Sequence, residues 1–308
     1  MNIREYKLNT SLNSQTFWAY LQLMRPANIV TAWADILAGY AASGLFLSDY
    51  GWHTTEIVWL LLSTTGLYGG GIVFNDVFDS AIDAQERPER PIPSGRASRL
   101  GAIWLGSLLL LMGVIAASQV TLLSFTLAAI VALAAIIYDA LGKHHPWLGP
   151  INMGCCRGGN LLLGVSAVPT MVAQQWFLAL IPIAYIAAIT AISQGEVHGG
   201  KKTIGAIAIG LIVVVISGLL VLGLLPNYQV LITLPFVGLL AGRVLPPFVK
   251  AAGQPQPDLI KSAVKAGVLS LIVLDATMAA GFAGWVYGLL VLLLLPISAR
   301  LAQLFAVT

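Results

Sequence analysis

Three aspartates follow a long apolar segment at the spacing of one helical face. Asp76, Asp79 and Asp83 stand at positions i, i+3 and i+7, so a helix that continues to residue 83 would present all three on one side. Three carboxylates on one face repel each other unless a cation lies between them. Mg²⁺ suits such a site, because it binds few protein oxygens and is completed by water and phosphate. The spacing therefore predicts a magnesium face, with the amide of Asn75 beside it.

Basic residues crowd the same stretch and predict the binding of a diphosphate. Arginine grips phosphate bidentately and lysine acts as a point charge. The basic residues expected around the diphosphate are Arg25, Arg87, Arg90, Arg96, Lys143, Lys201 and Lys202. For any one of them the alternative is a residue that only sets membrane topology. The prolines among the arginines cannot continue a helix, so residues 87–95 are expected to form a stiff loop over the site.

The composition predicts an all-α polytopic membrane protein. The chain has 308 residues, of which 58% are hydrophobic and 9% charged, whereas soluble domains have about 25% charged residues. Apolar runs long enough to cross a bilayer predict nine or ten transmembrane helices, because the last two are separated only by residues 281–284. The runs are 27–48, 57–78, 101–119, 121–141, 150–172, 176–195, 203–224, 228–248, 263–281 and 284–305.

The basic residues also predict the orientation in the membrane. They fall at the N-terminus, in or beside the loops after the second, fourth, sixth and eighth predicted helices, and at the C-terminal end. An excess of Lys and Arg marks the cytoplasmic side of a membrane protein. The N-terminus and the aspartates are therefore expected to face the cytoplasm. The net charge of +3 follows from this topology and requires no nucleic-acid partner. We expect an integral protein of a bacterial inner membrane, because no transit peptide precedes Arg25.

The stretch "NDVFDSAID…RPERPIPSG" (residues 75–95) resembles the first aspartate-rich motif of the UbiA superfamily of intramembrane prenyltransferases. "LMRPAN" (23–28) resembles the usual start of that family, and "YDALGKHH" (138–145) resembles its tyrosine-plus-lysine segment. "SQGEVHGGKKTIG" (193–205) stands in the place of the second aspartate motif. The resemblance covers nearly the whole chain and predicts one domain over residues 1–308. Within the superfamily it is nearest to the EboC-like branch.

This resemblance implies a helix bundle around a central cavity that opens toward the cytoplasm. It also implies a polyprenyl diphosphate donor, a Mg²⁺ cofactor and transfer of the prenyl group to a small, often aromatic acceptor. The residues expected to be catalytic are Asp76, Asp79, Glu196, Tyr138 and Lys143. Those expected to bind the metal are Asn75, Asp76, Asp79, Asp83 and Glu196. Aromatic faces stabilise cations, and Phe74, Tyr68 and Tyr138 are candidates for that role.

The second motif departs from the family pattern. Where the family commonly has acids, this chain has Ile192 and Gln194, and only Glu196 keeps a carboxylate. Three outcomes stay open. The protein is a prenyltransferase with one metal or a weakly bound second one; it uses a different donor or performs cyclisation; or it is non-catalytic and binds or transports an isoprenoid or lipid. The acceptor and the oligomeric state do not follow from the sequence.

Several polar residues are expected at the acceptor or along the cavity, because charges within a membrane usually face the interior. Asp35 is expected either to orient an acceptor hydroxyl or to pair with Arg157. Asp275 is expected either to bond a neighbouring helix or to stay protonated and neutral. The full set expected to line the acceptor site or cavity is Asn28, Asp35, Asn152, Arg157 and His198. Asn160 is expected in helix packing, as are the adjacent thiols of Cys155 and Cys156.

Overall fold

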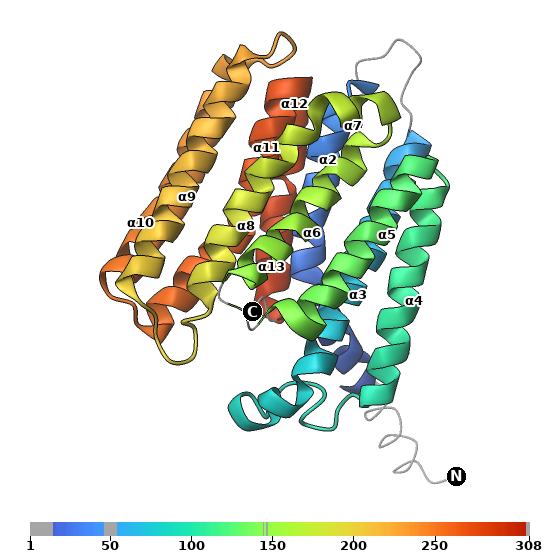
Figure 1. Cartoon of the computed structure of the whole chain (residues 1–308), viewed down its shortest axis with the longest axis vertical. Helices are drawn as coiled ribbons and strands as arrows, with labels where there is room; N and C mark the ends of the chain where they lie inside the picture. The colour runs from blue at the N-terminus through green and yellow to red at the C-terminus, as the bar shows by residue number, and fades with distance from the viewer. Residues whose placement is uncertain (1–14, 46–53, 144, 146, 306–308) are drawn as a thin grey trace.

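The structure is a computed structural model that describes residues 15–45, 54–143, 145 and 147–305 (Figure 1). The basic residues Arg4 and Lys7 of the N-terminus, the end of the first predicted helix (46–48), residues 49–53 after it, and His144 lie outside these ranges. All regular structure within them is helical, which confirms the all-α prediction. Residues 15–24 are helical, and the helices that follow are α2 (Pro26–Ala42), α3 (Thr54–Glu86), α4 (Arg99–Ser118), α5 (Leu122–Ile137), η2 (Tyr138–Gly142), α6 (Leu148–Val165), α7 (Pro169–Gln175), η3 (Trp176–Ala179), α8 (Leu180–Ser193), α9 (Lys202–Val221), η4 (Leu222–Leu224), α10 (Val230–Gly253), α11 (Pro257–Ala283), α12 (Trp285–Leu292) and α13 (Leu294–Leu304).

Eight helical segments of the described residues are long and apolar enough to cross a membrane. The segments α2 and α6 are not among them: α2 has 17 residues, and α6 contains Asn152, Arg157 and Asn160 within its 18 residues. In Figure 1 both lie between the α9–α10 side and the α4–α5 side of the bundle, with α6 packed against α5 and α8. The count of nine or ten membrane-crossing helices therefore stays a prediction.

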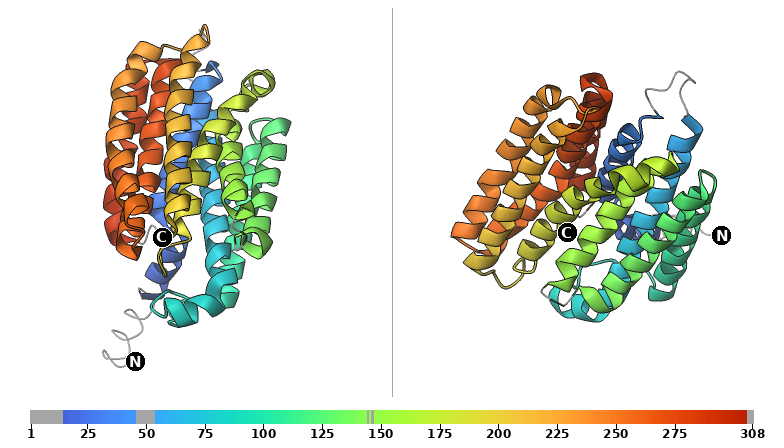
Figure 2. Two further views of the ribbon diagram at one scale, coloured as in Figure 1. Left: turned by 60° about the vertical axis from the view of Figure 1, so that its left-hand side comes forward. Right: turned by 45° about the horizontal axis from the view of Figure 1, so that its top comes forward.

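The helices form two groups that meet at α2 and α6. In the right-hand view of Figure 2, α9 and α10 lie at one edge of the bundle and α4 and α5 at the other. Between them, α2 packs against α3, α6 and α11, and α6 packs against α5 and α8. The most buried membrane-length helix is α11, with 83% of its apolar window buried. The centre of the bundle is therefore built from α2, α6 and α11.

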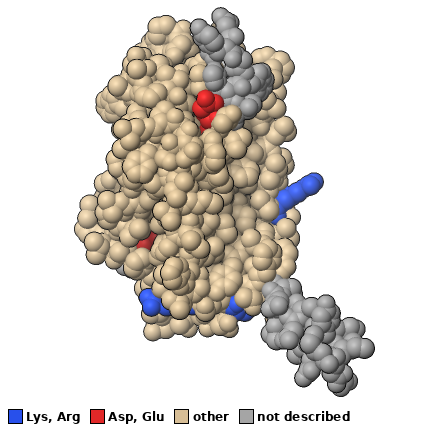
Figure 3. Space-filling view, turned by 90° about the vertical axis from the view of Figure 1, so that its right-hand side faces the viewer, with Lys and Arg blue, Asp and Glu red and all other residues tan. Residues whose placement is uncertain are grey.

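The polar turns gather at one end of the bundle. The turns that follow α3, η2, α8 and α10 all lie at the lower end in Figure 1. The face drawn in Figure 3 carries few charged side chains over its middle, and most of its Lys and Arg side chains lie along its lower part. This separation of charge from apolar surface is what a bilayer requires.

Glycines let α2 and α6 touch backbone to backbone. A β-carbon on Gly164 would lie 3.0 Å from Ile36 Cα and 3.1 Å from Gly39 Cα, and still closer to the carbonyl oxygen of Ile36. Small residues permit such close contacts between helices in lipid, where packing rather than the hydrophobic effect holds helices together. This contact fixes the separation of α2 and α6, which carry Asp35 and Arg157.

We predict that Gly164→Ala lowers the free energy of unfolding by about 1–3 kcal/mol, because the new methyl group forces the backbones of α2 and α6 apart. Gly210→Ala is the matched control, since a β-carbon on Gly210 meets nothing within 4 Å. Thermal unfolding of the two variants in detergent tests this. Equal unfolding temperatures for the two variants would show that the α2–α6 contact is loose.

Candidate active site

The three aspartates lie on one continuous helix, as the spacing predicts. The helix α3 runs through to Glu86, so Asp76, Asp79 and Asp83 all project from its last turns. Asp76 and Asp83 are buried, with 4% and 5% of their surface exposed. A helix C-terminus disfavours negative charge, so these carboxylates need cations from elsewhere in the chain.

Arg90 bridges two of the aspartates. Its Nη1 donates to Asp83 Oδ2 at 2.7 Å and to Asp76 Oδ1 at 3.4 Å. The loop between α3 and α4 turns back on itself to make this possible, with Ala97 N donating to Pro91 O at 2.9 Å. The proline-rich loop therefore covers the end of α3, and its arginine lies among the aspartates.

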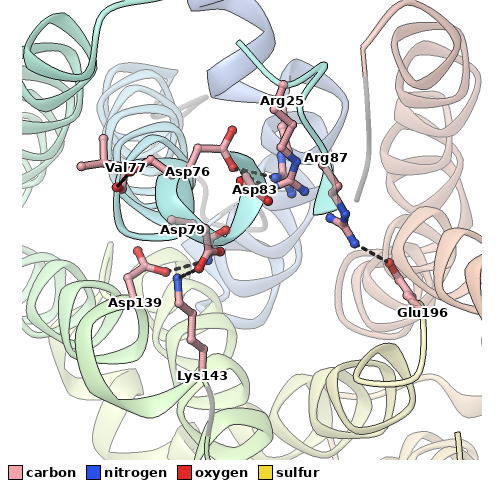
Figure 4. Close-up of polar contacts among 12 residues, drawn as sticks. Arg25, Asp76, Val77, Asp79, Asp83, Arg87, Asp139, Lys143 and Glu196 are labelled. Carbon is pink, nitrogen blue, oxygen red and sulfur yellow. Dashed lines mark hydrogen bonds and ion pairs between the residues drawn. The ribbon is translucent and has the colours of Figure 1, made fainter. Parts of the chain in front are cut away.

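Arg25 reaches the same aspartate from the start of α2. Its Nη2 donates to Asp76 Oδ1 at 2.9 Å, as Figure 4 shows. The backbone of Arg25 has φ 46° and ψ 70°, a left-handed conformation directly before Pro26. Among the described residues no other side-chain-bearing residue has positive φ. Such strain costs about 1–3 kcal/mol and gathers at functional sites.

Lys143 pairs with the third aspartate across a π-helical turn. Its Nζ lies 2.5 Å from Asp79 Oδ1 (Figure 4). The turn η2 ends α5 with one extra residue per turn, and such turns often mark functional sites. The side-chain amide of Asn152 on α6 faces this turn: with its oxygen and nitrogen exchanged, it donates to Ala134 O and accepts from Tyr138 N, both at 3.2 Å. Asn152 thus binds backbone and is absent from the residues that line the main cavity, contrary to its predicted place there.

Asp139 is a site residue that the sequence analysis did not single out. It is 4% exposed and accepts a hydrogen bond from Asn75 Nδ2 at 2.9 Å. Figure 4 places it beside Asp79 and Lys143. The signal that could have revealed it is its spacing of four residues from Lys143, which puts both on one side of the helix end.

The charged groups at the end of α3, with Arg25, Arg90 and Lys143, form what we call the mouth of the site. Glu196 lies across this mouth from α3. Its Oε2 is 3.8 Å from Arg87 Nη2 (Figure 4), beyond a direct hydrogen bond but close enough for attraction. Burial raises the pKa of the Glu196 carboxyl above its ordinary value, and Arg87 is the strongest of the basic residues that oppose this. The remaining acid of the second motif therefore faces the first motif.

The other predicted residues of the mouth lie farther out. Arg96 donates hydrogen bonds to Gln22 Oε1, Glu89 O and Ser94 Oγ, all within 3.0 Å. It therefore stabilises the loop between α3 and α4. Lys201 and Lys202 are exposed at the start of α9, and Lys201 borders a second pocket. His198 is 83% exposed and 4.0 Å from Glu86 Oε1, which places it at the surface and outside the main cavity.

A cavity of about 220 Å³ extends from this mouth into the bundle. Arg25, Asn75 and Asp139 border its outer part. Its apolar walls come from side chains of α3, α5, α6 and α8, including Leu67, Ile72, Val131, Met153 and Ile186. Asn28, Tyr68 and Tyr138 also line it, whereas Phe74 does not: its ring packs against Gly106 of α4.

A buried ionic cluster borders the cavity inside the bundle. Arg157 Nε lies 2.6 Å from Asp35 Oδ2, though not aligned as a hydrogen bond. Asn160 Nδ2 donates to the same oxygen at 2.8 Å, and the guanidinium carbon lies 5.1 Å from the centroid of the Tyr68 ring. Asp275 of α11 is fully buried and close enough to Arg157 and Asp35 for their charges to influence each other, but neither of its carboxyl oxygens has a hydrogen-bond partner among the described residues. The predicted pairing of Asp35 with Arg157 is therefore present, and Asn160 takes part in it.

The carboxylates at the mouth fit Mg²⁺ only together with other ligands. Within the described residues, no three His, Cys, Asp or Glu side chains are close enough to hold a metal ion. Mg²⁺ usually takes one or two carboxylates and is completed by substrate phosphate and water. Asp76 and Asp79 suit that arrangement, since Asp76 bonds Arg25, which lines the cavity, so a metal here would depend on a phosphorylated ligand.

Comparison with known proteins decides the family. The model of the UbiA prenyltransferase family matches residues 36–252, which include the aspartates, η2 and Glu196. The chain belongs to the UbiA prenyltransferase family. Among curated relatives, it is 34% identical over 199 residues to a digeranylgeranylglyceryl phosphate synthase of Methanothrix thermoacetophila, covering 60% of this chain and 70% of that one. It is 32% identical over 153 residues to the protein of the same name from Thermococcus kodakarensis, covering 49% of this chain and 53% of that one.

Solved structures of the family share the fold. A UbiA homolog from Aeropyrum pernix K1 has a TM-score of 0.62 at 13% identity, over 81% of this chain and 96% of that one. A UbiA homolog from Archaeoglobus fulgidus bound to GPP and Mg²⁺ has a TM-score of 0.56 at 16% identity, over 89% and 99%. These structures show the shared fold, and the family match over residues 36–252 confirms the predicted superfamily. The EboC-like branch and the bacterial inner membrane stay predictions, and the relatives named here are archaeal.

We predict that Arg157→Met lowers the free energy of unfolding by about 3–5 kcal/mol, because it leaves two buried carboxyls without their cation. Arg99→Met is the control, since Arg99 is exposed at the start of α4 and should change stability by no more than about 0.5 kcal/mol. Thermal unfolding in detergent measures both. If the two variants unfold at the same temperature, the cluster contributes nothing to stability.

Proposed function

We propose that the chain transfers a polyprenyl group from its diphosphate to a small acceptor inside the membrane, with Mg²⁺ at the diphosphate. The observation that carries this proposal is the charged mouth: aspartates interleaved with Arg25, Arg90 and Lys143 directly beside an apolar cavity. The family of the chain and the solved homolog bound to GPP and Mg²⁺ support it.

Donor binding divides between the two parts of the site. The diphosphate belongs at the mouth, where guanidinium and ammonium groups can bind its oxygens. Bound Mg²⁺ would neutralise charge that builds on the departing diphosphate. The prenyl chain belongs in the cavity, whose walls are mainly aliphatic.

Transfer breaks the bond between the first prenyl carbon and the diphosphate oxygen, and the electron pair stays with the diphosphate. The allylic cation is attacked by the acceptor, which forms the new bond and loses a proton. The rings of Tyr68 and Tyr138 border the cavity and can stabilise the cation. The apolar walls exclude water that would otherwise capture it.

The reduced second motif favours a site that depends mainly on the first. Glu196 is the one acid from that loop near the mouth, and it faces Arg87 rather than the aspartates. Asp139 supplies a further carboxylate from the other side. A protein that only binds an isoprenoid diphosphate is the alternative, and it is favoured by this same loss of acids.

Release of diphosphate from labelled geranylgeranyl or farnesyl diphosphate tests the activity. Purified protein should release diphosphate with Mg²⁺ and an acceptor extract, and chelation of Mg²⁺ should abolish the release, because the carboxylates and the diphosphate repel each other without a cation. Binding of the labelled donor without any metal-dependent release would reject transfer in favour of the binding protein.

We predict that Asp76→Asn and Asp79→Asn each lower the rate of diphosphate release about a hundredfold or more, the usual loss when a group that stabilises developing charge is removed. Glu196→Gln should lower it less. The matched control is Glu89→Gln, an exposed acid of the loop between α3 and α4, which should leave the rate unchanged. A loss for Glu196→Gln equal to that for Asp76→Asn would mean that both motifs carry the metal equally.

A further inference from the structure

The cavity has a polar inner region that the binding of a prenyl chain does not explain. Thr64 and Arg157 both border the cavity, and both are buried, with 0% and 2% of their surface exposed. Within the part of the chain that the structure describes, Thr64 Oγ1 and both terminal nitrogens of Arg157 lack hydrogen-bond partners. Unpartnered polar groups in a protein interior are rare and costly, so a ligand oxygen there would satisfy them.

The guanidinium of Arg157 still has donors to offer. The Tyr68 ring covers one of its faces at 5.1 Å, but guanidinium N–H groups point outward in its own plane. The Asp35 carboxylate lies next to Nε. The terminal nitrogens therefore keep N–H groups that an oxygen atom in the plane of the guanidinium can accept.

The charge of the cluster argues against an anion at this place. One arginine faces two carboxyls, those of Asp35 and Asp275, both 0% exposed. If one carboxyl holds a proton the cluster is neutral, and if neither does it is negative. Neither state attracts a phosphate or carboxylate, for which burial is costly without a net positive partner. An uncharged oxygen accepts the same hydrogen bonds without that cost.

We propose that Thr64 and Arg157 form a subsite for an uncharged oxygen, a hydroxyl or a carbonyl, of a second ligand that enters the cavity. That this ligand is the acceptor of prenyl transfer rests on the proposed function. The two ends of the site then bind groups of different charge. The diphosphate binds among the cations of the mouth, and an uncharged head group binds at the inner end of the cavity. An acceptor that carries a phosphate at this end does not fit the subsite.

Two adjacent cysteines allow a local measurement. Cys156 borders the cavity, whereas Cys155 is exposed on the outside of α6. In a Cys155→Ser background, methyl methanethiosulfonate modifies the remaining thiol, and a ligand in the cavity slows this reaction. The probes are 1-naphthol and 1-naphthoate, which share a ring system and differ in charge. The assay contains neither Mg²⁺ nor diphosphate, so its outcome is independent of whether transfer occurs.

We expect 1-naphthol to protect Cys156, and 1-naphthoate to need a concentration about tenfold higher or more for the same protection. Thr64→Val keeps the shape of the side chain and should raise the half-protecting concentration of 1-naphthol about fivefold. Thr277→Val is the control, because it removes a buried hydroxyl of α11 that bonds Val273 O and lies outside the cavity lining. In the Thr277→Val variant, 1-naphthol should protect Cys156 at the same concentration as in the parent protein.

Three results would overturn the subsite. Equal or better protection by 1-naphthoate would make it an anion receptor. Unchanged protection by 1-naphthol in Thr64→Val would mean that the hydroxyl takes no part. No protection by either probe would mean that the inner region accepts no such ligand.

Discussion

The architecture of the site depends on how negative charge is held at the end of one helix. Asp76, Asp79 and Asp83 stand in the last three turns of α3, where their charges repel one another and the helix dipole disfavours that of Asp83. Each is stabilised by a cation from a different part of the chain: the start of α2, the loop after α3, or the turn after α5. The strained backbone of Arg25, the folded proline-rich loop and the π-helical turn all serve this pairing. The same groups make the mouth a place where phosphate oxygens can exchange with carboxylate oxygens.

The length of α3 explains why so charged a mouth is compatible with lipid. A helix of 33 residues is about 50 Å long, while the hydrocarbon core of a bilayer is about 30 Å thick. One continuous helix can therefore line an apolar cavity with its middle and present acids near the membrane surface with its end. The donor that we propose has the same division, with a long apolar chain and a charged head.

Much of this was predictable from residue spacing. The helical face of aspartates, the basic loop above it and the family motif follow from the order of residues 75–95, and the pair Asp35–Arg157 follows from the cost of lone charges in a membrane. The pairing of each arginine with a particular carboxylate could not be predicted, because it depends on the path of the backbone, such as the left-handed conformation at Arg25. Phase along α3 also mattered: Thr64, Tyr68 and Asn75 share the face that lines the cavity, whereas Phe74 is one residue out of phase and turns to α4.

The buried cluster has a consequence for the order in which the bundle assembles. Its members come from early, middle and late parts of the chain, at residues 35, 157 and 275. During synthesis, α2 and α6 can meet long before α11 has been made, since domains form as their segments emerge. The centre of the protein is thus completed only when a helix near the end of the sequence docks between helices that are already inserted. A chain interrupted before α11 would lack the helix that packs most extensively against α2, and its buried pair of Asp35 and Arg157 would have less protein around it.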